Sequence, residues 1–322
     1  PSIGRLVKYR PPEEEVRDGI TVRNDTGVEE GGEISMFYDP MIAKLVTHGP
    51  TRIAAIDAQA DALDAFYIDG IQHNVPFVSA LMHHPRWREG RLSTGFIAEE
   101  YPEGFAPRVA EGEELKALVS VAAAIDHLHN ARRREIDGQM TNGSVVFAKR
   151  RVVDISGERQ TIEVTAGDDQ LTVGFLGRDG AAEQSLAVRS AWKAGDPVWR
   201  GEVGGKAVSV QVRPILNGVT LSYRGIQSPV YVYTEREAEL VSLMPVKAAA
   251  DMSKFLLCPM PGLVKAIHTS EGAEVKAGDA LAIVEAMKME NILRAERDGV
   301  VKTVNAKAGD SLAVDAVILE FV

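Results

Sequence analysis

The carboxyl-terminal part of the chain contains an internal repeat, which limits the possible fold more than any other feature. The segment 262–267, Gly-Leu-Val-Lys-Ala-Ile, recurs as Gly-Val-Val-Lys-Thr-Val at 299–304, a shift of 37 positions, and Gly272 recurs as Gly309 at the same shift. Each copy alternates apolar and polar residues and turns at a glycine, which is typical of short antiparallel strands. Residues 255–322 are therefore predicted to form a small, pseudo-symmetric β sandwich.

One lysine lies between the two copies of the repeat. Lys288 is the centre of the run Glu-Ala-Met-Lys-Met (285–289), which is flanked by apolar strand ends. This order predicts a hairpin tip at 286–289, with the lysine projecting into water. An exposed lysine alone would be an ordinary surface residue. Met287 and Met289 change that interpretation, because flexible, polarizable side chains at an exposed tip suit a surface that another protein recognises.

These residues resemble the biotin carboxyl carrier domain of biotin-dependent carboxylases. The resemblance rests on 285–289 and on the upstream run Cys-Pro-Met-Pro-Gly at 258–262. A motif of this kind identifies a site only when the surrounding structure is the expected one. It implies that biotin is joined to Lys288 by an amide bond, that Met287 and Met289 are the cofactor's neighbours, and that a biotin protein ligase attaches it. A lipoyl domain has a related fold, but it usually carries Asp-Lys-Ala at the hairpin tip.

The composition argues against several other classes of protein. A formal net charge of −10 disfavours a broad nucleic-acid surface, which needs clustered Lys and Arg. Cys258 is the only cysteine, so no internal disulfide forms and a reducing compartment is favoured. The longest strongly apolar run, 117–125, is too short to cross a bilayer. The chain starts at Pro1 without a signal-peptide pattern or a methionine, which suggests a piece of a longer protein.

The region 1–105 mixes strand and helix patterns and is predicted to be an α+β unit. Strands are expected at 19–23 and 33–38, and a helix from Thr51 to Tyr67 with Thr51 as its N-cap. The region resembles the end of the carboxyl-terminal lobe of the biotin carboxylase domain. The matching residues are Pro-Ser-Ile-Gly-Arg-Leu (1–6), Val22-Arg23, Tyr-Asp-Pro-Met-Ile-Ala-Lys-Leu (38–45), and Asp-Gly-Ile (69–71) leading to Asn74.

The resemblance implies that the ATP-grasp part, with ATP and its Mg²⁺ or Mn²⁺, precedes this region in the family. The arginine that stabilises the enolate-like charge of biotin would fall upstream of Pro1. Arg23 does not match that motif, and a strand arginine beside Asp25 is the preferred interpretation. The glycine pairs 31–32 and 204–205 have the pattern of turns rather than phosphate-binding loops. We therefore expect no catalytic residue in this chain, and no carboxylation of biotin by it alone.

The region 110–243 is predicted to be one long helix followed by strands. Acidic residues at 111–114 and three arginines at 132–134 match the two ends of a helix dipole. About eight short alternating runs follow, from 144–147 to 230–233, and they predict an antiparallel barrel or sandwich wrapped around the helix. This arrangement resembles the domain of propionyl-CoA carboxylase and its relatives that docks on the carboxyltransferase subunit.

Four residues of this region are possible site residues. His127 and His129 lie two apart, on different faces of the helix, and are poorly placed to share a metal. Trp192 and Trp199 suit either a subunit contact or packing in the core, and core packing is favoured. Residues 244–254 are predicted to be an exposed linker that would span at most roughly 35–40 Å.

The predicted fold is therefore multidomain and mainly β: the end of the lobe (1–105), a helix-containing antiparallel barrel (110–243), the linker and the sandwich (255–322). The resemblance implies the biotin-carrying α subunit of a propionyl-CoA carboxylase, a ligase that forms C–C bonds. ATP and bicarbonate carboxylate the biotin, and a β subunit, in a hetero-oligomer expected to be a dodecamer, converts propionyl-CoA to methylmalonyl-CoA. A 3-methylcrotonyl-CoA carboxylase, a lipoyl-type carrier and a noncatalytic assembly module remain alternatives. Bacterial cytoplasm and mitochondrial matrix both fit.

Overall fold

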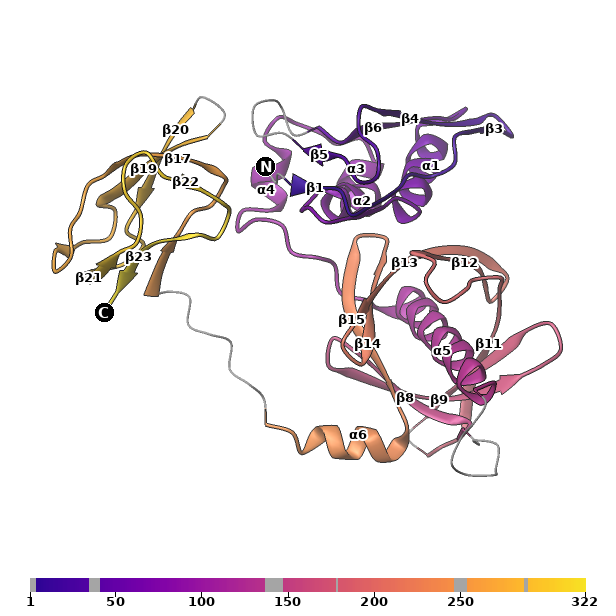
Figure 1. Cartoon of the computed structure of the whole chain (residues 1–322). Coiled ribbons are helices and arrows are strands. Elements are labelled where there is room, and N and C mark those ends of the chain that lie inside the picture. The colour runs from indigo at the N-terminus through magenta and orange to yellow at the C-terminus, as the bar shows by residue number, and fades with distance from the viewer. Residues whose placement is uncertain (1–3, 35–40, 137–146, 178, 246–253, 287–288) are drawn as a thin grey trace.

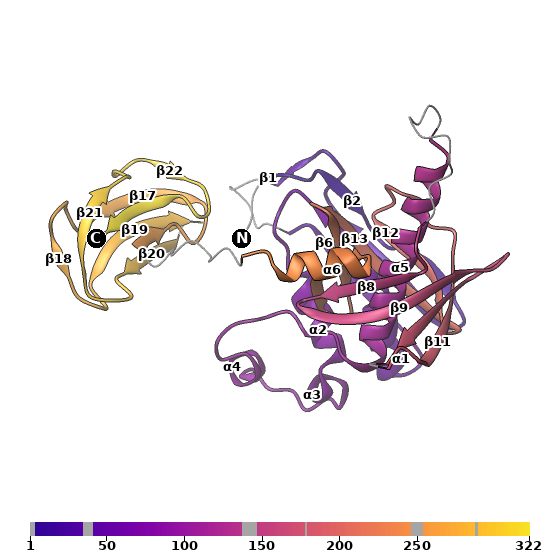
Figure 2. The ribbon, with the colours of Figure 1, turned by 90° about the horizontal axis from the view of Figure 1, so that it is seen from below.

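The computed structural model describes residues 4–34, 41–136, 147–177, 179–245, 254–286 and 289–322 (Figures 1 and 2). An α+β unit is followed by a β barrel that surrounds a helix, and then by a β sandwich. The predicted multidomain, mainly β fold is confirmed. The expected strand at 144–147 and the linker lie largely outside the described residues.

The amino-terminal unit packs helices against short antiparallel sheets. Its strands are β1 (Gly4–Arg5), β2 (Lys8–Arg10), β3 (Glu15–Arg17), β4 (Ile20–Thr26), β5 (Glu33–Ile34), β6 (Ala43–His48) and β7 (Tyr67–Asp69). Its helices are α1 (Arg52–Asp64), α2 (Val75–His83), α3 (Pro85–Arg88) and α4 (Phe96–Glu100). We refer to this unit as the lobe.

Helix α1 begins as predicted but ends earlier than predicted. The Thr51 hydroxyl accepts a hydrogen bond from the Ala54 N–H at 3.1 Å, which is the expected N-cap. The helix ends at Asp64, and Tyr67 pairs with Arg10 in the β2–β7 ladder. The predicted end at Tyr67 was therefore wrong, because strand pairing with a distant segment overrode the local helical pattern.

Among the described residues, eight antiparallel strands close into a barrel, and α5 (Gly112–Arg134) runs through it (Figure 1). A closed barrel leaves no unpaired strand edge. Its strands are β8 (Arg150–Ile155), β9 (Glu158–Ala166), β10 (Leu171–Leu176), β11 (Ala182–Ser190), β12 (Val198–Val203), β13 (Lys206–Ile215), β14 (Gly218–Tyr223) and β15 (Ile226–Tyr233).

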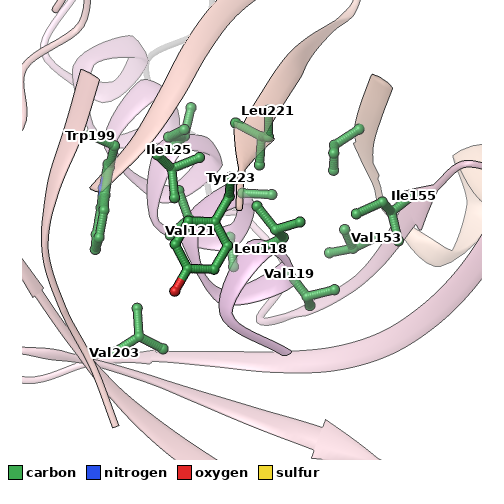
Figure 3. Packing of buried hydrophobic residues seen from close by; sticks show 14 of the residues in the cluster. Leu118, Val119, Val121, Ile125, Val153, Ile155, Trp199, Val203, Leu221 and Tyr223 are labelled. Carbon is green, nitrogen blue, oxygen red and sulfur yellow. The ribbon is translucent and has the colours of Figure 1, made fainter. Parts of the chain in front are cut away.

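The barrel is filled by side chains of α5. Leu118, Val119 and Val121 are fully buried, and they face Trp199 and Leu221 from the strands (Figure 3). A helix that is apolar on most sides is stable only when it is surrounded in this way. The barrel interior is therefore a packed core, and the assignment of Trp199 to core packing is confirmed.

Trp192 also belongs to this core. It is 8% exposed, and its ring stacks on that of His129, with the centroids 6.2 Å apart. Its indole N–H donates to the Asp196 carbonyl at 2.9 Å, so the one polar atom of the ring is satisfied. The core assignment therefore holds for both tryptophans.

The carboxyl-terminal unit is the predicted sandwich of two four-stranded sheets. One described sheet has the order β16-β23-β21-β18 and the other β20-β19-β17-β22. The strands are β16 (Phe255–Leu257), β17 (Gly262–Ile267), β18 (Glu274–Val275), β19 (Ala280–Ala286), β20 (Met289–Arg294), β21 (Gly299–Val304), β22 (Ser311–Leu312) and β23 (Val317–Phe321).

The two copies of the repeat interlock in this sandwich. The Gly272 N–H bonds to the Val301 carbonyl at 2.8 Å, and the Gly309 N–H bonds to the Val264 carbonyl at 2.8 Å, so equivalent residues make equivalent bonds across the copies. Both glycines have positive φ, 81° and 94°, which a glycine adopts without strain. Each sheet combines strands from both copies, so neither copy completes a sheet alone.

Helix α6 (Glu235–Ser242) follows the barrel and precedes the sandwich in the chain. Thr234 and Glu237 form a capping box at its start, and Ala238 is buried. Within the described residues, none of the helices combines the length and the apolar character needed to cross a membrane.

The barrel core provides the first testable prediction. Leu118→Ala should destabilise the barrel by about 2–5 kcal/mol, because a fully buried leucine leaves a cavity when it is truncated. Leu216→Ala is the matched control: Leu216 is 85% exposed in the turn between β13 and β14, and its loss should cost less than about 0.5 kcal/mol. Urea unfolding followed by tryptophan fluorescence measures both, and equal costs would contradict the helix-filled core.

Candidate functional site

The candidate site is the hairpin formed by β19 and β20. Ala286 lies opposite Met289 in the ladder, so Met287 and Lys288 are the two residues that connect the strands. Both of these residues lie outside the described ones, and their roles remain predictions. The residues on either side are described: Ala286 is buried, and Met289 is 64% exposed.

The segment 258–262 packs against both strands of the hairpin. The Cys258 thiol is fully buried and lies 3.0 Å from the Met260 carbonyl oxygen, and burial raises its pKa. The Asn291 amide nitrogen is 3.5 Å from the Met260 sulfur and 3.4 Å from the Met289 carbonyl oxygen. The segment that carries the family resemblance therefore packs against the β20 arm of the hairpin.

At Gly262, the backbone of this segment lies very close to the β19 arm of the hairpin. A Cβ atom at this position would lie 2.6 Å from the Glu285 carbonyl oxygen and 2.7 Å from a methyl carbon of Val284. Only glycine allows the backbones to approach so closely. The last residues of β19 before the candidate lysine thus lie directly against β17.

Charged residues stabilise the outer face of the hairpin. Glu285 and Glu290 lie directly opposite each other, and like charges in this arrangement repel. The Lys265 ammonium group is 2.8 Å from the Glu285 carboxylate, and this contact, with a smaller effect of Glu290, raises the pKa of Lys265. The pair is exposed to water, so its main effect is to offset the repulsion locally.

These contacts show which residues the sequence reasoning found and which it missed. The run 285–289 and the segment 258–262 were predicted as the candidate site, which stays a prediction, but the contacts of Lys265 and Asn291 were not predicted. Their signal was present in the alternation of β17 and β20, which places Lys265 on the outer face, but the partners depend on strand register.

Arg23 and possible metal-ligating side chains are the remaining candidates. Arg23 pairs with Asp25 at 3.0 Å, with both side chains more than half exposed, which confirms the strand ion pair. In the part of the chain that the structure describes, no cluster of three or more His, Cys, Asp and Glu side chains is arranged to hold a metal.

Three family models match successive parts of the chain. Residues 1–99 match the biotin carboxylase C-terminal domain, residues 118–247 the propionyl-coenzyme A carboxylase BT domain, and residues 255–321 the biotin-requiring enzyme domain. The three matches follow the order of lobe, barrel and sandwich.

Individual relatives agree with this order. The propionyl-CoA carboxylase alpha chain of Ruegeria pomeroyi is 46% identical over 100% of this chain and 49% of its own length. The human mitochondrial propionyl-CoA carboxylase alpha chain is 31% identical over 99% of this chain and 43% of its own. The mouse methylcrotonoyl-CoA carboxylase subunit alpha is 26% identical over 100% of this chain and 44% of its own. The chain spans about half the length of the curated relatives it matches.

The lobe, the helix-filled barrel and the hairpin-bearing sandwich together define a biotin-dependent carboxylase chain. The sequence matches are stronger with propionyl-CoA carboxylase alpha chains than with the methylcrotonoyl-CoA subunit. The chain belongs to the propionyl-CoA carboxylase alpha-chain family.

The repeat offers an internal control for the role of Gly262. Gly262→Ala should destabilise the sandwich by about 1–3 kcal/mol, because the new methyl group clashes with the Glu285 carbonyl. Gly299→Ala, at the equivalent position of the second copy, should be tolerated, because its nearest contact would be a Phe321 ring carbon at 3.7 Å. Hydrogen exchange of β19 in the intact chain measures the difference, and equal protection in both variants would refute the clash.

Proposed function

We propose that this chain carries biotin, joined to Lys288 by an amide bond, as part of the α subunit of a propionyl-CoA carboxylase. The observation that carries the proposal is the β19–β20 hairpin. Its described arms end at Ala286, two residues before Lys288, and resume at Met289, one residue after it. Gly262 lies against the first arm, and Asn291 makes contacts on the second. The 46% identity with the alpha chain from Ruegeria pomeroyi supports the choice of acyl-CoA class.

Biotin supplies a ureido nitrogen that carries a carboxyl group between two active sites. The residues of this chain would anchor it and present it. Lys288 provides the amine for the amide bond, and Met287 and Met289 are its neighbours. The 64% exposure of Met289 suits contact with the enzymes that attach or use biotin.

A separate ligase and the other parts of the complete carboxylase supply the remaining steps. A biotin protein ligase attaches the cofactor, and an ATP-grasp part that uses ATP with Mg²⁺ or Mn²⁺ carboxylates it with bicarbonate. A carboxyltransferase β subunit then transfers the carboxyl group to propionyl-CoA and forms methylmalonyl-CoA. The reducing bacterial cytoplasm or the mitochondrial matrix suits a chain with Cys258 as its only cysteine.

The barrel is proposed to dock on the β subunit. Its interior is filled by the side chains of α5, which leaves its outer surface and its ends for binding. The 244–254 segment would let the carrier travel, and tethering raises the effective biotin concentration at each active site toward the millimolar range. A hetero-oligomer with more than one copy of each chain, up to a dodecamer, is consistent with this role.

Attachment is tested by Lys288→Arg. After co-expression with a biotin ligase, the parent chain should show the mass of one added biotinyl group and bind streptavidin, whereas Lys288→Arg should show neither. Lys265→Arg is the control, because it keeps the charge that pairs with Glu285 and removes only another lysine. Biotin that persists in Lys288→Arg, or that disappears in Lys265→Arg, would contradict the assignment.

The acyl-CoA choice is tested with the full-length subunit and its partner. Carboxylation of propionyl-CoA should exceed that of 3-methylcrotonyl-CoA, in line with the identities of 46% and 26% to the respective alpha chains. Equal rates with the two acyl-CoA substrates would overturn the propionyl choice and leave the attachment site unaffected.

A further inference from the structure

The lobe and the barrel meet at a joint built from backbone groups of the lobe and side chains of the barrel. The Gln211 amide donates to the Leu63 carbonyl at 3.1 Å, and the Arg213 guanidinium donates to the Ile68 carbonyl at 2.9 Å. Side chains of barrel strand β13 therefore donate to two backbone carbonyl groups of the lobe, one in the last turn of α1 and one in β7.

A turn of the barrel is seated on the second lobe helix. At Gly225, between β14 and β15, a Cβ atom would lie 2.7 Å from the backbone of Ala80 in α2. The Gly225 carbonyl accepts from the Arg108 N–H at 3.1 Å, and the Arg224 carbonyl accepts from the Arg108 guanidinium at 2.8 Å. The turn 223–226 is thus enclosed between the lobe and the segment that enters α5.

Asp64 lies at the centre of this joint. It is the last residue of α1 and is 4% exposed, and one carboxyl oxygen accepts from the Arg224 N–H at 2.8 Å and lies 3.5 Å from the Ser79 hydroxyl. Arg224 has φ +50°, a conformation that residues other than glycine rarely adopt. The carboxyl group therefore holds a strained residue of the barrel in place from the lobe.

The cations near Asp64 are engaged elsewhere. The Arg108 guanidinium pairs with Glu114 at 3.1 Å, and that of Arg224 lies 4.0 Å from Glu114 and 5.1 Å from the Tyr223 ring centre. The charged and titratable groups facing the joint come from every element around it: Asp57 and Asp61 on α1, His83 on α2, Arg88 on α3, Arg108 before α5, Glu114 on α5, and Tyr223 and Arg224 on the turn.

These surroundings favour the protonated, uncharged form of the Asp64 carboxyl group. Burial is the main cause that raises the pKa of Asp64 to about 8, with Asp61 adding to it and the Arg224 N–H opposing it. Burial also lowers the pKa of His83 to about 4, helped by Arg224, Arg108 and Arg88, so His83 is uncharged at neutral pH and adds no cation to the joint.

We propose that the joint is proton-linked: docking of the turn 223–226 on the lobe takes up one proton, held on the buried Asp64 carboxyl, and the joint weakens as the pH rises. The sign follows from linkage. The docked group has the higher affinity for the proton, so the docking equilibrium is favoured most below pH 4 and falls by up to tenfold per pH unit between about 4 and 8. Above about 8 the group is ionised in both states, and its effect is constant.

Asp64→Asn tests the proposal in the full chain. The amide keeps an oxygen for the Arg224 N–H but carries no charge at any pH. The readout is the protection of the Arg224 amide against hydrogen exchange between pH 5 and 8.5, corrected for the intrinsic rate. The ratio of the protection in Asp64→Asn to that in the parent chain should increase by up to tenfold for each unit by which the pH rises. It should level off near pH 8.

Two further variants complete the experiment. Asp64→Ala removes the acceptor and should lower the protection at all pH values. Asp18→Asn is the control: Asp18 also lies in the lobe, but it is 88% exposed and pairs with Arg17 outside the joint, so the substitution should leave the pH profile of the parent chain unchanged. A ratio of Asp64→Asn to parent protection that stays constant, or that falls as the pH rises, would overturn the proposal. This outcome is independent of the biotin attachment at Lys288.

Discussion

The structure depends on the burial of one helix inside a closed barrel. Leu118, Val119 and Val121 of α5 are fully buried, and the strands around them contribute Trp199 and Leu221 to the same core. Without the helix, the barrel would enclose a cavity, and without the barrel, an apolar helix would be exposed to water. Each element is therefore stable only with the other, and together they form one packed core to which the lobe and α6 are joined.

The packed barrel presents the surfaces that contact the lobe. Gln211 and Arg213 extend from β13 to carbonyl groups of the lobe, and the turn 223–226 lies against α2. The lobe is thus positioned by several short contacts. The proposed carrier role requires the opposite for the sandwich, because biotin must reach two active sites.

The elements that the sequence predicts well are those whose signals are local. The alternating repeat with its two glycine turns predicted the sandwich, and acidic and basic residues at opposite ends of an apolar run predicted α5. The end of α1 was predicted wrongly, because Tyr67 pairs with a strand that lies far away in the chain. The environment of Asp64 could not be predicted for the same reason, since its partner Arg224 is distant in sequence. At the candidate site, the motif predicts the position of the lysine, but only the strand register gives Lys265 and Asn291 their partners.

The sandwich also shows how a symmetric scaffold can bear one site. The two copies share strand order, glycine turns and hydrogen bonds, yet their first glycines have different surroundings. Gly262 lies against the Glu285 carbonyl next to the candidate hairpin, whereas Gly299 has space around it. Met260 and Asn291 add a contact on the same side. The repeat thus provides the stable core, and the departures from symmetry gather around the hairpin that bears Lys288, where a proposed attachment site needs a rigid base.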